Sequence, residues 1–139
     1  AALELADGRM IIGKTTDLLG PCAALLLNAL KELAGIPHSQ PVISPAAIEP
    51  IQTLKTQYLG SKNPRLHMDE VLIALSVSAA SDPNAQKALE QLPNLKGCQA
   101  HTSVMVSDVD RKLFMKLSIQ ATFEAKYENN SVIFPKKGI

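Results

Sequence analysis

The hydrophobic pattern alternates between strand-like and helix-like segments along most of the chain. Residues 3–6 and 9–12 are short apolar stretches on either side of an Asp-Gly pair, which favours a tight hairpin turn. From Pro21 to Gly35 apolar residues recur at helical spacing, with a proline suited to the first turn and a glycine suited to the end. The pattern predicts a β-hairpin followed by a helix that is buried on more than one side.

The middle of the chain predicts one short strand and three helices. A β-branched pair at residues 42–43 indicates the strand, and a proline at position 50 starts the next helix, which runs through residue 58. Two acids open a helix over residues 69–80, where the macrodipole favours negative charge. An Asp-Pro cap and apolar residues at helical spacing predict a further helix, ended by Pro93.

The last third predicts a strand, a helix and two more strands. Residues 102–106 have the composition of a buried strand, and Ser107 with Asp110 resembles the capping box that opens a helix. The inward face of that helix is predicted to hold Val109, Leu113 and Leu117. Alternation over residues 119–125 indicates a strand with one wet face, and a final short strand is expected at 132–134.

Alternating strands and helices are typical of an α/β domain, and 139 residues are the size of one domain. Two cysteines are too few for a disulfide framework and are expected to be buried thiols. The longest apolar runs fall far short of the roughly 20 residues that cross a bilayer, so no membrane partner is predicted. We expect one soluble intracellular domain over residues 1–139, cut from a longer protein.

Composition and charge exclude further classes of function. A hydrophobic fraction of 46% with 19% charged residues indicates a folded domain rather than a disordered tail. The net charge of +1 argues against a dedicated nucleic-acid binder, which usually carries a concentrated basic field. With few aromatic residues and no tryptophan, a stacking platform for single strands is not expected either.

Residues 8–15 match the phosphate-loop pattern G-x-x-x-x-G-K-[ST]. A true phosphate loop needs backbone amides that curl around phosphates, whereas the four central residues here, Arg-Met-Ile-Ile, favour extended backbone. The nucleotide-triphosphate loop is therefore rejected. Lys14 and Thr15 still stand just before a helix, where they either hold an anion or form an ordinary solvated connection.

Two further groups of polar residues are candidates for chemistry. Arg65, His67 and Asp69 could form an acid/base pair or a phosphate clamp, but a simple helix start with a locally paired arginine would contain the same residues. His101 would join a site only if it lay near His67, and alone it is a structural histidine. The catalytic candidates are His67, Asp69 and His101, and the ligand-binding candidates are Lys14, Thr15 and Arg65.

The zinc-deaminase motif is absent. That motif needs H-x-E followed by P-C-x-x-C. The chain offers His67-Met68-Asp69, and its Pro21-Cys22 comes earlier with no second cysteine three positions on. No metal is predicted, and no pattern identifies a cofactor.

The segments NPRLHMDEVLIALS and ALEQLPNLKGCQAHTSVMVS resemble the DUF 1846 family, bacterial proteins classed only as of unknown function. Family members are longer, so the chain resembles their C-terminal domain. The resemblance implies a cytoplasmic protein and a three-layer α/β/α sandwich around a mixed sheet, with a topology similar to the deaminases. It implies the N-terminal domains of the same protein as partners, and it brings no catalytic assignment.

Two functions remain open at this point. The first is a ligand-binding or catalytic-accessory domain that takes a small anionic molecule, such as a phosphate or nucleotide, between strand ends and helix N-termini. The second is a structural or oligomerisation domain without a site of its own, which would use the apolar excess of its helices to contact a neighbouring domain or a second copy. The sequence does not decide whether the domain is an enzyme.

Overall fold

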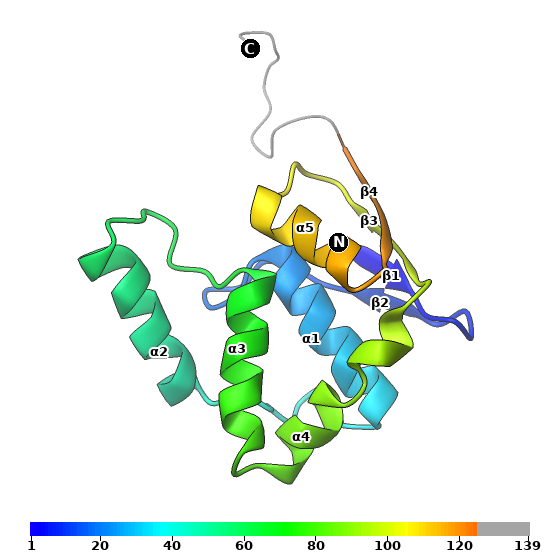
Figure 1. Ribbon diagram of the computed structural model, residues 1–139, viewed down its shortest axis with the longest axis horizontal. Coiled ribbons are helices and arrows are strands. Elements are labelled where there is room, and N and C mark those ends of the chain that lie inside the picture. Colours follow the sequence, from blue (N-terminus) through cyan, green and yellow to red (C-terminus); the bar gives the residue numbers. More distant parts are fainter. Residues whose placement is uncertain (125–139) are drawn as a thin grey trace, which may run out of the picture.

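The computed structural model describes residues 1–124, drawn in colour in Figure 1. The elements run in the order β1 (Ala2–Glu4), β2 (Met10–Ile12), α1 (Pro21–Ala34), α2 (Pro45–Thr53), the π-helical turn η1 (Leu54–Tyr58), α3 (Met68–Ala79), α4 (Pro83–Leu89), the 3₁₀ turn η2 (Leu92–Leu95), β3 (Gln99–Thr102), α5 (Asp108–Lys116) and β4 (Gln120–Phe123). The strand expected at 132–134 lies outside the described residues.

The four strands form one mixed sheet in the order β2-β1-β3-β4. β1 is antiparallel to both β2 and β3, while β3 and β4 are parallel and joined through α5. β2, β3 and β4 therefore run in the same direction. The predicted hairpin is confirmed, with Gly8 in the turn at a φ of 91° that favours glycine.

One face of the sheet is covered and the other is open within residues 1–124. Leu3, Ile11 and Ala100 stand in register across three strands, and all three are buried against the helices. Their neighbours Glu4 and Gln99 alternate to the opposite face and are exposed. The expected α/β class and mixed sheet are confirmed. The described residues hold no helical layer on the open face, so the three-layer arrangement and the deaminase-like topology stay predictions.

The helices stack outward from the covered face. α1 contacts β1 and β2, α5 contacts β4, α3 packs on both of these helices and on α4, and α2 packs on α3 (Figure 1). The helix predicted from Pro21 is confirmed and ends at Gly35, whose φ is 72°. None of the described helices has both the length and the apolar run that a membrane crossing requires.

Two predictions for the first half of the chain are wrong. Residues 42–43 lie in a loop and are buried. A short apolar pair is found in buried loops as well as in strands, so its composition alone did not distinguish the two. The helix expected to start at Pro50 begins instead at Pro45, whose extended neighbour Ser44 is the N-cap. A proline suits the first turn of a helix, and the structure has Pro45 rather than Pro50 in that position. Pro50 lies inside the helix, which continues although Pro50 has no backbone N–H to donate.

Two predictions for the second half also need correction. The strand expected at 102–106 is β3, which ends at Thr102. In α5 the capping serine is confirmed, since the Ser107 hydroxyl accepts the N–H of Asp110 at 3.2 Å. The predicted inner face is confirmed at Leu113 and Leu117, which pack against the core, and is wrong at Val109, which is 43% exposed. Phe114 and Asp110 are buried on this side of the helix as well.

Candidate functional site

The carboxyl ends of β2, β3 and β4 meet at one edge of the sheet because the three strands share a direction. Residues 13–17 leave β2 at this edge, and residues 103–107 leave β3 there. In open α/β sheets, ligands bind in the crevice outside the carboxyl ends of the strands. This edge is therefore where a ligand site is expected.

A cavity of about 260 Å³ lies at this edge, between the two loops and the start of α1. Its lining includes Gly13, Lys14, Thr15, Pro21, Ser103 and Val104. Lys14, Thr15 and Ser103 are exposed, and they bring one ammonium and two hydroxyl groups to the same cavity. Two of the three predicted ligand-binding residues are thus brought together.

The amino end of α1 meets the same cavity through Pro21, its first residue. The N-cap is Gly20, the first turn holds no acidic residue, and no side-chain cap is formed there by any described residue. The backbone N–H groups of Cys22 and Ala23 lie in this uncapped turn, and both residues are buried. Uncapped amides and the positive end of the helix dipole suit this end of α1 to an anion.

Arg65 forms a hydrogen bond to the loop after β2, as the alternative of a paired arginine at a helix start allows. Its Nε donates to the carbonyl of Thr16 at 2.6 Å, and the neighbouring Leu66 pairs with the chain at Leu18 and Gly20. Arg65 thereby ties the loop after β2 to the segment that precedes α3. It is not among the residues that line the cavity with Lys14.

A second cavity of about 220 Å³ adjoins the first, since Pro21 and Val104 line both. It lies among the N-terminal ends of α1, α3 and α5 and the loop before α5. Its polar lining comes from Cys22, Asn63, His67, Ser107 and Asp110. The catalytic candidate His67 therefore stands next to the site of Lys14, in a separate compartment.

Asp110 is the buried charged group of this second cavity, with 7% of its surface exposed. Its Oδ1 accepts the backbone N–H of Met68 at 2.9 Å, so a residue of α5 caps the start of α3. Burial raises the pKa of the Asp110 carboxyl, while the Met68 bond and His67 oppose that shift. Burial and the nearby Asp110 raise the pKa of the Cys22 thiol to about 12, which keeps Cys22 a neutral thiol.

The N-terminus of α3 is filled by carboxylates. Glu70 accepts the backbone N–H of His67 at 2.8 Å and lies 3.5 Å from its Nδ1. Asp69, one of the catalytic candidates, is exposed and accepts the N–H of Glu70. The partner of the His67 ring is therefore Glu70, and this helix end is a poor place for an anion.

His101 lies on the open face of the sheet, away from His67. Its Nδ1 is 2.7 Å from the Thr122 hydroxyl and its Nε2 is 3.2 Å from the carboxylate of Glu124. It lines a shallow hollow of about 320 Å³ on that face, together with Glu4 and Met10. The two histidines share no cavity. His101 was expected to belong to a site only if it lay near His67, and it does not.

No group of three or more His, Cys, Asp or Glu side chains that could hold a metal ion occurs within residues 1–124. The chemistry that the two cavities offer is therefore that of ammonium, hydroxyl, imidazole and carboxylate groups with backbone amides. Such groups bind and orient a charged small molecule.

We predict that Asp110 makes the chain less stable as pH rises above the ordinary aspartate pKa of 3.8, until the raised pKa of the folded state is passed. Because the folded state holds the Asp110 proton at higher pH than the unfolded state, whose pKa is near the ordinary value of 3.8, the unfolding free energy falls through this window. Met68, His67, Asp69 and Glu70 face Asp110 and are unchanged in Asp110→Asn. Denaturant unfolding of both proteins should show wild type losing stability relative to Asp110→Asn as pH rises, and a constant difference would contradict this.

Ser103 and Asp110 were missed as site residues. Ser103 was placed inside the predicted strand, although a hydroxyl directly after a strand was the available signal. Asp110 was interpreted as part of a local cap, and its partner Met68 lies 42 positions away. No local pattern reports a contact of that separation.

Comparison with known proteins gives a family but no activity. The model of the family described as "Domain of unknown function DUF1846, C-terminal" matches residues 1–133. The chain is 56% identical over 131 residues to a UPF0371 protein of Corynebacterium glutamicum, covering 94% of this chain and 26% of that protein. A UPF0371 protein of Streptococcus thermophilus is 46% identical over 127 residues, covering 91% and 26%. The chain thus spans about a quarter of the length of these relatives.

Proposed function

The chain belongs to the family of DUF1846 C-terminal domains, and within that family we propose that it binds a small anionic molecule, phosphate-like or nucleotide-like, at the carboxyl edge of β2 and β3. One observation carries the proposal: Lys14, Thr15 and Ser103 line one cavity together with Pro21, the first residue of a helix whose start has no side-chain cap. Backbone amides at a helix start, an ammonium group and hydroxyls together form a usual phosphate environment.

Charge supports the first cavity rather than the second for the anion. The second cavity already holds the buried carboxylate of Asp110, and Asp69 and Glu70 raise its pKa further, which indicates a negative potential there. The first cavity holds Lys14 and no acidic side chain. An anion would therefore be repelled by the His67 compartment and attracted to the Lys14 compartment.

We expect Lys14→Ala to weaken the binding of inorganic phosphate and adenosine monophosphate about tenfold or more. A hydrogen bond to a charged group contributes about 1.5–3 kcal/mol, and a factor of ten corresponds to about 1.4 kcal/mol. Isothermal titration calorimetry on the purified chain measures the change. The matched control is Lys62→Ala, an exposed lysine in the loop before α3 that should leave affinity unchanged. Equal affinities of wild type and Lys14→Ala would contradict the proposal.

A catalytic role for His67, Asp69 or His101 stays a prediction. His67 is the best placed of the three, because its cavity adjoins that of Lys14. Asp69 and His101 lie outside both cavities. The cytoplasmic location also stays a prediction.

The open face of the sheet favours a second candidate, an interaction domain. α1 uses its apolar excess inside the core, whereas Ile73 and Val77 of α3 are 61% and 68% exposed. The sheet face around Met10 and His101 is also uncovered by residues 1–124. Because the relatives are about four times longer, their remaining domains are the proposed occupants, and a layer on this face would complete the three-layer sandwich.

If the chain is an interaction domain, a second copy of it is the other candidate to cover the open sheet face. Analytical ultracentrifugation of the chain, alone and mixed with the rest of a full-length family member, tests the interaction domain. A clean monomer that does not join the remaining domains would exclude it.

A further inference from the structure

We propose that the ligand carries an amine as well as its anionic group, and that the amine binds in the adjoining cavity against the carboxylate of Asp110. The inference deepens the proposed function and rests on it, since the anionic group is assigned to the cavity of Lys14. The ligand class is thus a small amino-phosphate or a similar molecule with opposite charges at its two ends.

The two cavities together have the size of one ligand site. Each alone, at about 260 Å³ and about 220 Å³, is smaller than the roughly 300 Å³ at which small-molecule sites begin. Pro21 and Val104 line both, so the two cavities are neighbours on either side of these residues. One molecule that reaches across this shared wall would fill both.

Asp110 is a largely buried carboxylate with one hydrogen bond from the protein, and since no fully buried side-chain oxygen among residues 1–124 lacks a partner, its other oxygen is open to the cavity. It is more than nine-tenths buried, and the bond from Met68 to Oδ1 is the single hydrogen bond to its side chain among residues 1–124. A buried carboxylate is costly unless it is paired and hydrogen-bonded. An ammonium group carries three donors and a positive charge, so it supplies both requirements.

The surroundings of Asp110 do not supply that cation themselves. From α3, Asp69 and Glu70 add negative potential, which the backbone N–H of Met68 and the neighbouring His67 counter. From α1, Cys22 remains a neutral thiol. The Ser107 hydroxyl, which accepts the N–H of Asp110, carries no charge. A cation from the ligand is therefore the matching partner.

The wall between the two charged ends is apolar. Val104, Met105 and Val106 line the second cavity on the side of the loop before α5, and Pro21 lies opposite in α1. Such side chains fit a short hydrocarbon linker better than a polar one. An alkyl chain with a phosphate at one end and an amine at the other is the simplest molecule of this kind.

The test compares phosphates that differ only in the amine. Titration calorimetry at neutral pH measures the affinity of the chain for 3-aminopropyl phosphate and 5-aminopentyl phosphate, each against propyl phosphate or pentyl phosphate. In wild type we expect at least one amine to bind about tenfold or more tightly than its matched alkyl phosphate. The gain should vanish in Asp110→Asn, which keeps the shape of the side chain, and persist in Asp108→Asn, whose carboxylate is exposed on the same helix.

The outcomes separate this inference from the proposed function. If alkyl phosphates bind through Lys14 and neither amine adds affinity, the inference is wrong and the anion site stands. If the gain survives in Asp110→Asn, the amine binds elsewhere and the inference is equally wrong. If no phosphate of either kind binds, both fail. The comparison within wild type needs no variant, so a folding defect in Asp110→Asn does not weaken it.

Discussion

Replacing Gly13 by alanine is expected to destabilise the folded chain by about 3 kcal/mol, at the upper end of the usual cost of overpacking. A Cβ at Gly13 would overlap the backbone N of Leu25 and lie 2.5 Å from its Cα and 2.6 Å from its Cβ. Leu25 is fully buried in the second turn of α1, so the helix backbone itself would have to move. Urea unfolding monitored by circular dichroism measures the loss.

Gly20→Ala is the matched control for Gly13→Ala. A Cβ at Gly20 would have the carbonyl of Leu66 as its nearest neighbour at 3.7 Å, which is ordinary contact. We expect this change to cost less than about 1 kcal/mol, since alanine is only a poorer N-cap than glycine. Equal stabilities of the two variants would show that β2 and α1 are not in the close contact described above. That contact sets Lys14 beside the start of α1, at the proposed anion site.

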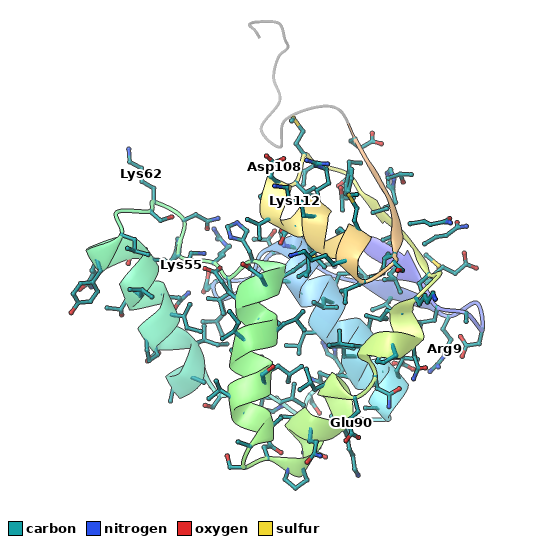
Figure 2. All side chains as sticks on the ribbon, viewed as in Figure 1. Arg9, Lys55, Lys62, Glu90, Asp108 and Lys112 are labelled. Atoms are coloured by element: carbon teal, nitrogen blue, oxygen red, sulfur yellow. The ribbon has the colours of Figure 1, made fainter. Side chains whose placement is uncertain are left out.

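Lys55→Met is the second change with a large expected effect, about 3 kcal/mol of lost stability. Lys55 is 7% exposed, and its Nζ donates to Oε1 of Glu70 at 2.9 Å and to the carbonyl of Arg65. Figure 2 shows Lys55, a residue of η1, on the side of that segment that faces α3. Removing one partner of a buried ion pair costs about 3–5 kcal/mol because the other charge is left without compensation. Glu70 is 23% exposed and keeps the N–H of His67, which favours the lower end of that range.

Two variants check this explanation of Lys55. Lys62→Met, at an exposed lysine of the same region (Figure 2), should change stability by less than about 0.5 kcal/mol. Adding Glu70→Gln to Lys55→Met should recover part of the loss, since the uncompensated charge is removed. If Lys55→Met unfolds at the same denaturant concentration as Lys62→Met, the ion pair does not hold η1 to α3.

Local patterns predicted those elements whose signals lie within a few residues. The Asp-Gly turn, the helix between Pro21 and Gly35, and the capping serine at position 107 each depend on neighbouring residues, and the structure has all three. Lys14 and Thr15 were predicted at the start of a helix for the same reason. A polar loop before a helix is recognised from neighbouring residues, and so are the ammonium and hydroxyl groups that Lys14 and Thr15 place there.

The bounds of β3 and the inner face of α5 depend on contacts with distant elements, which the local sequence pattern does not contain. β3 alternates exposed Gln99 and His101 with buried Ala100 and Thr102, and its small buried side chains are a weak signal beside the apolar residues that follow. Placing the strand too late left the direction of His101 unknown. In α5 the helical spacing of Val109 suggested the inner face, but contacts with α3 turn Asp110 inward instead. A contact between helices far apart in sequence has no local signature.

The central claim is that the first turn of α1, Lys14 and Ser103 bind an anion together. The most direct measurement is a titration of the ¹⁵N-labelled chain with inorganic phosphate, followed by amide chemical shifts in nuclear magnetic resonance spectra. The account predicts saturable shifts of the Lys14, Cys22, Ala23 and Ser103 amides, and their loss in Lys14→Ala. Shifts confined to the open sheet face around His101, or no saturable shift at all, would contradict it.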